Sequence, residues 1–212
     1  MTVVKTNPPM LIQVTTLELN RGGRLLFTDL SFYLWRQGIL LVKGPNGAGK
    51  SSLLQVLAGI LRPDAGRVGW YLDDPEAPRL HYLGHAPGVK SRLTAAENLT
   101  FWREVNGPTG IAVGDALEQV GLGGLADIEA GHLSAGQTRR LALARLLVSK
   151  RPVWLLDEPT SSLDAAGHAL VGRMMRDHAA SGGTVMAATH DDIPDMAAAH
   201  ILELGTLASA PS

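Results

Sequence analysis

A glycine-rich loop between an apolar run and a helical pattern constrains the fold of this chain more than any other stretch. The apolar run covers residues 39–42, and residues 52–58 follow the loop with the pattern of a helix. The loop matches G-x-x-x-x-G-K-[ST], in which glycines let successive backbone N–H groups wrap a polyphosphate at a helix N-terminus. Its residues are Gly44, Pro45, Asn46, Gly47, Ala48, Gly49, Lys50 and Ser51. An ordinary turn is the alternative interpretation, but strand, loop and helix together predict a nucleotide-phosphate site.

The last two residues of the loop supply its side-chain chemistry. Lys50 is expected to reach the β- and γ-phosphates, and Ser51 is expected to offer its hydroxyl to Mg²⁺. The pattern therefore predicts a bound nucleotide together with a magnesium ion.

Composition and charge narrow the class of protein. The 212 residues are 45% hydrophobic, which is enough for one sizeable α/β core with a small appended subdomain. The net charge is −1 and the densest basic pair is Arg139–Arg140, so we expect no nucleic-acid partner. The chain has no cysteine, which excludes disulfides and thiolate metal sites. No apolar run approaches 18 residues and residues 1–10 lack an apolar core, so neither a transmembrane span nor a secretory signal is expected.

The order of predicted elements indicates an α/β fold. Short strands are expected at 11–19, 25–27, 31–35, 39–42, 67–71, 80–83, 153–156 and 184–188. Helices are expected to begin at the Thr94/Glu97 capping box, to cover 115–120, to run from Ser134 through 147 and to cover 165–180. The first three strands form an antiparallel portion, and the later apolar runs that alternate with helices are typical of buried parallel strands.

Two carboxylates follow the buried strand predicted at residues 153–156. Asp157, at the tip of that strand, would hold Mg²⁺ directly or through water, and Glu158 would polarise the water that attacks the γ-phosphate. An acidic turn before Pro159 is the alternative. The presence of a phosphate loop in the same chain favours the catalytic interpretation.

Two further features have both a structural and a functional interpretation. Ser134 and Gln137 satisfy a capping box, but a serine at a glycine-containing helix start is also an anion site. Whose phosphate it binds stays open, because one nucleotide already has a loop. His190 follows the strand at 184–188, where open α/β sheets bind ligands, and could orient the γ-phosphate. A merely packed or exposed histidine is the alternative.

Taken together, these motifs resemble the ATP-binding cassette (ABC) ATPase family. Residues 44–51 resemble its Walker A loop, 133–137 its signature, 153–158 its Walker B strand and 161–164 its D-loop, while His190 resembles its switch histidine. The resemblance covers about residues 11–204. It implies ATPase activity with ATP and Mg²⁺, and a P-loop fold with an antiparallel β subdomain, a parallel-sheet core and a helical subdomain. The expected single domain spans 1–205, with its core at about 1–84 and 150–205, its helical subdomain at about 85–149 and a loose tail at 206–212.

The resemblance also implies how two copies would share nucleotide. In this family two domains pair head to tail, so Ser134, Ala135, Gly136 and Gln137 would contact the ATP held by the other copy. Ser52 joins the expected ATP-binding residues, and Asp164 is the expected D-loop aspartate. This arrangement would account for the two phosphate sites in one chain.

Three positions depart from the family pattern. Ala135 replaces the usual second glycine of the signature, and we expect a single methyl group to do little harm. His85 stands where the Q-loop glutamine is usual and could reach a metal-bound water or the γ-phosphate. Arg21 stands where an adenine-stacking aromatic is usual, and its planar guanidinium can stack on a base.

The stretches 82–90, 93–99 and 133–140 resemble, more narrowly, the haem-exporter ATPases of cytochrome c biogenesis. That resemblance implies a peripheral protein on the cytoplasmic face of the bacterial inner membrane, partnered by integral membrane subunits of a haem-handling complex. The helical segment around 85–102 is the expected docking face. Direct haem binding is not expected, because the chain has no cysteine and its histidines suggest no ligand pair.

Three other functions compete with this one. The chain could be the ABC motor of a transporter for a different solute. It could instead be a soluble ABC switch acting on DNA or ribosomes, although such proteins usually carry paired cassettes or long coiled-coil insertions. A small-molecule P-loop kinase ranks last, since it would lack the signature at 133–137.

Overall fold

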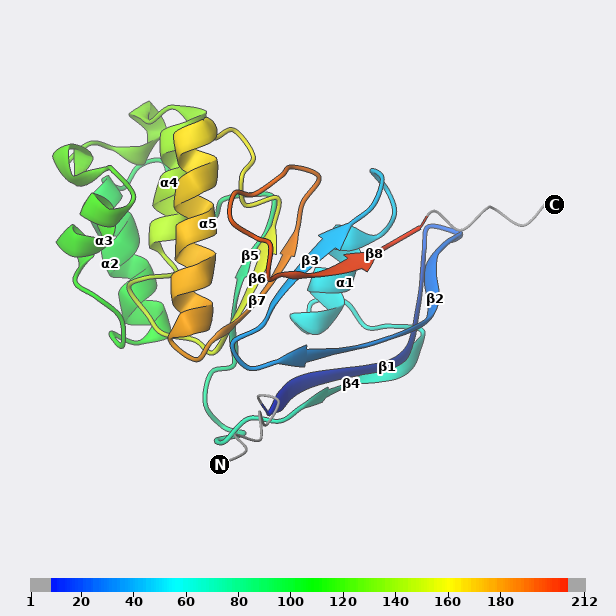
Figure 1. The fold of residues 1–212 in the computed structure, drawn as a ribbon. Helices are drawn as coiled ribbons and strands as arrows, with labels where there is room; N and C mark the ends of the chain where they lie inside the picture. The colour runs from blue at the N-terminus through cyan, green and yellow to red at the C-terminus, as the bar shows by residue number, and fades with distance from the viewer. Residues whose placement is uncertain (1–8, 206–212) are drawn as a thin grey trace.

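The computed structural model describes residues 9–205, which form two sheets and a helical region to one side of them (Figure 1). The predicted tail at 206–212 lies outside the described residues. The strands are β1 (Met10–Arg21), β2 (Arg24–Trp35), β3 (Ile39–Lys43), β4 (Ala65–Trp70), β5 (Leu80–Leu83), β6 (Val153–Asp157), β7 (Thr184–Ala188) and β8 (His200–Glu203). The α-helices are α1 (Lys50–Leu57), α2 (Ala95–Asn106), α3 (Val113–Gln119), α4 (Ala135–Ala144) and α5 (Ala165–Ala180).

The antiparallel sheet has the order β2-β1-β4. The prediction of two separate strands at 25–27 and 31–35 was wrong, because β2 is one strand of 12 residues. Asp29 adopts a left-handed backbone with a φ of 50°, and the register against β1 shifts nearby. Such an irregularity breaks the alternation of the sequence while the strand continues.

The parallel sheet has the order β5-β6-β7-β3-β8. The strand β7 therefore lies between β6 and β3, the strand that leads into the glycine loop. Because parallel strands all end at the same edge, residues that follow β3, β5, β6 and β7 gather there. The sequence prediction missed β8, a four-residue strand that pairs with β3 and whose residues are mostly exposed.

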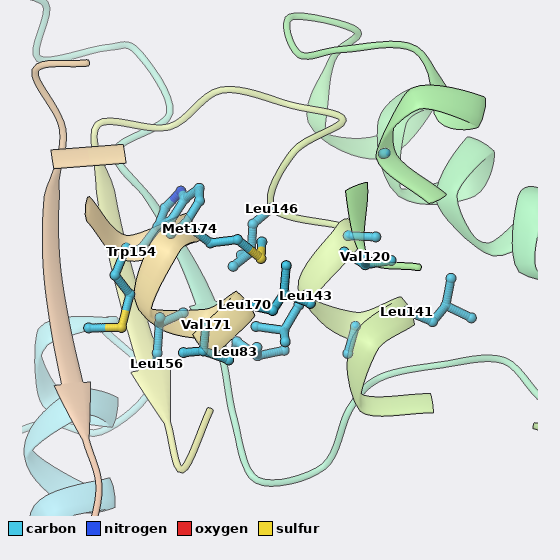
Figure 2. Packing of buried hydrophobic residues seen from close by; sticks show 14 of the residues in the cluster. Leu83, Val120, Leu141, Leu143, Leu146, Trp154, Leu156, Leu170, Val171 and Met174 are labelled. Atoms are coloured by element: carbon cyan, nitrogen blue, oxygen red, sulfur yellow. The ribbon is translucent and has the colours of Figure 1, made fainter. Parts of the chain in front are cut away.

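Alternate side chains of the parallel strands feed two separate hydrophobic cores. Trp154 and Leu156 point toward α4 and α5, and Figure 2 shows them packed with Leu143, Leu170 and Met174. The intervening residues point to the opposite face, where they pack against α1 and the antiparallel sheet; they are Val153 and Leu155 from β6 and Met186 and Ala188 from β7. Both faces of the sheet are therefore covered, as the continuous apolar runs predicted.

The helical region contains α2, α3 and α4, which Figure 1 shows on the same flank as α5. The capping boxes predicted at Thr94/Glu97 and Ser134/Gln137 are both present, and α5 has the predicted bounds. The helix predicted from Ser134 through 147 is α4, which ends earlier, at Ala144. Beyond it, backbone hydrogen bonds join residues three apart, such as the bond from the Leu147 N–H to the Ala144 carbonyl. Within residues 9–205 no helix combines the length and the hydropathy that crossing a membrane would require.

Candidate functional site

The glycine loop turns tightly between β3 and α1. Gly44, Gly47 and Gly49 have φ values of 142°, 79° and 96°, a region that side chains with a Cβ rarely adopt. At Gly44 a Cβ would also collide with the backbone carbonyl of Leu204. Gly49 is the N-cap of α1 and no side chain caps it, so the first N–H groups of the helix are left for a ligand.

Lys50 is held at the loop. Its side chain is buried, and its Nζ donates to the carbonyls of Gly44 at 2.7 Å and Pro45 at 3.2 Å. A buried ammonium on neutral carbonyls is only partly compensated, so an anionic ligand at this place would be strongly favoured.

Ser51 and Asp157 come together from opposite halves of the sequence. The Ser51 hydroxyl donates to Asp157 Oδ1 at 2.9 Å. Burial raises the pKa of the Asp157 carboxyl, and the hydrogen bond from Ser51 opposes that shift. A hydroxyl and a carboxylate are the hard oxygen donors that Mg²⁺ prefers, so this pair fits the ion that the sequence predicted.

Glu158 and His190 meet at the ends of the neighbouring strands β6 and β7. His190 Nδ1 lies 2.9 Å from Glu158 Oε2. Within the described residues Oε2 makes no aligned hydrogen bond, which leaves the carboxylate able to accept one from a water. Glu158 has a left-handed φ of 48°, so the sharp turn after β6 aims this side chain.

Lys50, Ser51, Glu158 and His190 line one cleft of about 560 Å³, whereas Asp157 lines a second hollow that Ser51 shares. The lining residues of the cleft are Arg21, Arg24, Leu26, Asn46, Gly47, Gly49, Lys50, Ser51, Ser52, His85, Glu158, Ser161 and His190. The predicted Arg21 sits at the end of β1, where its Nη1 lies 3.5 Å from the Ser52 hydroxyl. Of the other predicted loop residues, Ala48 is buried, and its N–H donates to the Pro45 carbonyl.

His85 lies where two hollows meet. It lines the nucleotide cleft and also a groove of about 550 Å³ between the sheet and the helical region. Trp102, Arg145 and Tyr82 line that groove as well. The His85 side chain therefore borders both hollows.

The signature residues lie outside the lining of the cleft. Ser134 is exposed, its hydroxyl accepts from the Gln137 N–H at 3.2 Å, and the Gln137 side chain accepts from the Ser134 N–H at 2.8 Å. Ala135 is exposed, whereas a Cβ on Gly136 would come within 3.0 Å of the Ser162 carbonyl. The signature therefore lies outside the lining of its own chain's cleft but next to the D-loop, whose Ser161 lines that cleft together with Lys50.

Asp164 has a local role in the structure. Its Oδ1 accepts from the Gly167 N–H at 2.8 Å, which caps α5, and it pairs with Arg140 at 3.1 Å. The hydrogen bond from Gly167 lowers the pKa of the Asp164 carboxyl, and the nearby charge of Arg140 lowers it further. The D-loop is thus tied to α4 within the same chain.

Three residues at the site were missed in the sequence. Arg24 lines the cleft beside Gly47, and only the two-residue turn after Arg21 hints at it. Asp191 accepts from the Thr160 hydroxyl at 2.8 Å and lies 3.4 Å from His190 Nε2, so it borders the histidine on its other side. Arg139 is buried and donates to the backbone around Asp157, which no local pattern indicates.

The sequence matches a family of known proteins. A sequence model of the ABC transporter family matches residues 27–161. The cytochrome c biogenesis ATP-binding export protein CcmA of Rhodopseudomonas palustris (strain BisB5) is 49% identical over 176 residues, covering 82% of this chain and 88% of that protein. The protein of the same name from Paramagnetospirillum magneticum is 48% identical over 200 residues, covering 90% of this chain and 92% of that protein.

A solved structure shares the fold. It is a dimeric ATP-binding cassette in a post-hydrolysis state with ADP and Pi, 21% identical, with a TM-score of 0.76 and coverage of 92% of this chain and 94% of that one. With the family match and the close relatives, this establishes that the chain belongs to the ABC transporter ATP-binding family, among the cytochrome c biogenesis ATP-binding export proteins.

Proposed function

We propose that this ABC ATPase powers a membrane complex that exports or delivers haem for cytochrome c maturation. The observation that carries the ATPase part is the meeting of Lys50, Ser51 and Glu158 in one cleft, with Asp157 hydrogen-bonded to Ser51 at its side. The haem part rests on relatives that are nearly half identical and are named for cytochrome c biogenesis and export.

Binding of ATP begins at the glycine loop. The N–H groups at the start of α1 and the Lys50 ammonium would receive the phosphates in place of the loop carbonyls that Lys50 now contacts. Ser51 and Asp157 would hold Mg²⁺, which would neutralise charge on the phosphate oxygens. Arg21 or Arg24 would lie beside the base, because both line the same cleft.

Hydrolysis needs a positioned water more than covalent chemistry. Glu158 would accept the proton of a water whose oxygen forms a bond to the γ-phosphorus, while the bond from that phosphorus to the ADP oxygen breaks. His190, 2.9 Å from Glu158, would hold the carboxylate in place and donate to a γ-phosphate oxygen.

A second copy would complete the site. The exposed Ser134 at the capped start of α4 is a prepared anion site that its own cleft does not use. We therefore propose that two copies close head to tail on two ATP molecules and reopen after hydrolysis. ATP would drive this closure because it binds the closed pair better than the open one.

The membrane subunits would dock at the groove beside His85, on the cytoplasmic face of the inner membrane. In this proposal they handle the haem, and this chain binds neither haem nor nucleic acid. The domain we propose as the working unit covers residues 1–205.

The test is purification of the tagged full chain from membranes in mild detergent. We expect Mg²⁺-dependent ATPase activity together with co-purifying integral membrane proteins whose fraction contains haem by its absorbance. The separately expressed chain should bind ATP but show no haem absorbance. Co-purification of a haem-free permease for another solute would contradict the haem part, and an inactive complex would contradict the ATPase part.

A further inference from the structure

The buried Arg139 of α4 connects three segments that are far apart in the sequence. Its Nη2 donates to the carbonyls of Asp157 at 2.7 Å and Glu158 at 2.6 Å, and its Nε donates to the Pro159 carbonyl at 3.2 Å. Its Nη1 donates to the Gly84 carbonyl at 3.2 Å, at the end of β5. One guanidinium thus binds the turn after β6 and the residue before His85.

Only an arginine can make this set of contacts. A guanidinium has five N–H donors in a rigid plane, whereas lysine is a point charge and glutamine has two amide donors. With Arg139 only 5% exposed, its charge is costly to bury, and the pKa of its guanidinium is lowered by that burial although Asp157 and Glu158 oppose the shift. The cost is unnecessary for filling space, since an apolar side chain would do that.

The turn that Arg139 binds is the one that aims Glu158. Glu158 has a φ of 48°, and its carbonyl accepts from both Arg139 and the Ser161 N–H. Without the guanidinium, the carbonyls of Asp157 and Pro159 would lose a buried donor, and the turn would have to rearrange to satisfy them. Such a rearrangement moves the Glu158 side chain but leaves the glycine loop, which Arg139 does not contact.

The same side chain also fixes the two walls of the cleft relative to each other. Gly84 precedes His85 and Asp157 precedes Glu158, and both His85 and Glu158 line the cleft. Arg139 lies in the helix that Ser134 caps, little more than one helical turn along the chain. A contact at the exposed helix tip can therefore reach the hydrolytic turn through one side chain.

We propose that Arg139 is a positioning residue for hydrolysis, holding Glu158 and the His85 wall in register with the signature helix of its own chain. The proposal rests on the ATPase function proposed above and adds to it a specific prediction. Arg139 supports the hydrolytic step and not the capture of nucleotide, so kcat and KM should respond differently to its loss.

The test compares Arg139→Gln and Arg139→Lys with a matched control, Arg151→Gln, in the full-length chain. Arg151 is also a buried arginine that donates to backbone carbonyls, those of Lys150 and Asn106, but it lines neither the cleft nor the groove. Steady-state ATPase kinetics, normalised to folded protein by the melting transition, and the melting shift caused by Mg·ATP are measured for each variant.

We expect Arg139→Gln to lower kcat about tenfold or more with KM changed less than about threefold. The shift with Mg·ATP should be retained, and Arg151→Gln should keep the wild-type kcat. Arg139→Lys should also lower kcat, and it decides the matter if the glutamine variant does not fold. An unchanged kcat, a lost melting shift or an equal loss of kcat in Arg151→Gln would each overturn the proposal. A wild-type protein without ATPase activity would instead refute the function on which it rests.

Discussion

His190 Nδ1 lies 2.9 Å from Oε2 of Glu158, although the two residues follow different strands of the parallel sheet. The contact exists because β6 and β7 are adjacent: Asp157, the residue before Glu158, is paired with Ala188, two residues before His190. Within the described residues, Glu158 Oε2 lies against His190 but accepts no aligned hydrogen bond, so this carboxylate is suited to accept a proton from water.

Replacing Glu158 with glutamine is therefore expected to remove the group that accepts the proton of water while keeping a side chain of the same size and shape. ATP turnover should fall by roughly 10²–10⁴-fold while Mg·ATP binding stays close to wild type. Phosphate release measured beside a nucleotide titration checks both parts. Asp192→Asn is the matched control, because that carboxylate is fully exposed and pairs only loosely with Lys43 at 3.6 Å. Wild-type turnover in Glu158→Gln would remove it from the catalytic role.

Lys50→Ala should abolish the stabilisation that Mg·ATP gives. The buried ammonium is the cation nearest the loop carbonyls, and without it the triphosphate loses its main charge partner. Thermal unfolding with and without 100-fold excess Mg·ATP over the wild-type Kd should show a clear shift for wild type and none for the variant. The exposed Lys150→Ala serves as control and should shift as wild type does. A shift that survives in Lys50→Ala would contradict the assigned phosphate site.

Asp157→Asn should weaken the affinity of the site for magnesium in particular. The amide keeps an oxygen for the Ser51 hydroxyl, now 2.9 Å from the carboxylate, but it carries no charge for the cation. We expect ATPase activity to require about tenfold or more Mg²⁺ for half-saturation, with nucleotide binding in EDTA unchanged. A magnesium titration identical to wild type would show that Asp157 does not serve the ion.

Stability should fall in acid because of His178, a histidine that does not line the cleft. His178 stacks on Trp154 with ring centroids 3.9 Å apart, and burial lowers its pKa to about 4. Since an unfolded histidine titrates near 6.5, the neutral ring contributes fully above that pH, and its contribution is lost as pH falls toward 4.

His178→Phe keeps a stacking ring that cannot titrate. Between pH 6.5 and 4, the free energy of unfolding should therefore fall less steeply with decreasing pH in the variant than in the wild type. The difference in slope should be about 1.4 kcal/mol per pH unit. Urea unfolding at several pH values provides the comparison. His81, whose pKa burial also lowers to about 4, should retain its own share of the acid sensitivity in the variant. Identical slopes for the two proteins would mean that His178 is already solvated when folded.

Much of this fold follows from local pattern. The glycine loop, the capping boxes at Thr94 and Ser134 and the helix α5 depend on neighbouring residues, so the sequence predicts them well. The continuity of β2 through Asp29 does not follow, because a left-handed residue in a bulge looks like a turn when read locally. The strand β8 owes its existence to pairing with β3 across the sheet edge, and its own four residues carry little signal.

The site divides in the same way. The sequence points to four residues because each stands in a motif or at a strand end. The topology of the sheet brings them together as two pairs, Ser51 with Asp157 and Glu158 with His190. Arg139 was noticed only as half of a basic pair, because its function depends on carbonyls that α4 meets after folding. Long-range contacts of a side chain with backbone leave no periodic trace in a sequence.

In the proposed dimer, ATP is bound between two copies, with Ser134 of one facing the glycine loop of the other. The mass of Glu158→Gln in solution, measured by light scattering with Mg·ATP, tests this arrangement. We predict twice the chain mass of 22.5 kDa with Mg·ATP and the single mass without it. A protein that binds ATP yet stays at the single mass at every concentration tested would show that ATP is not held between two copies.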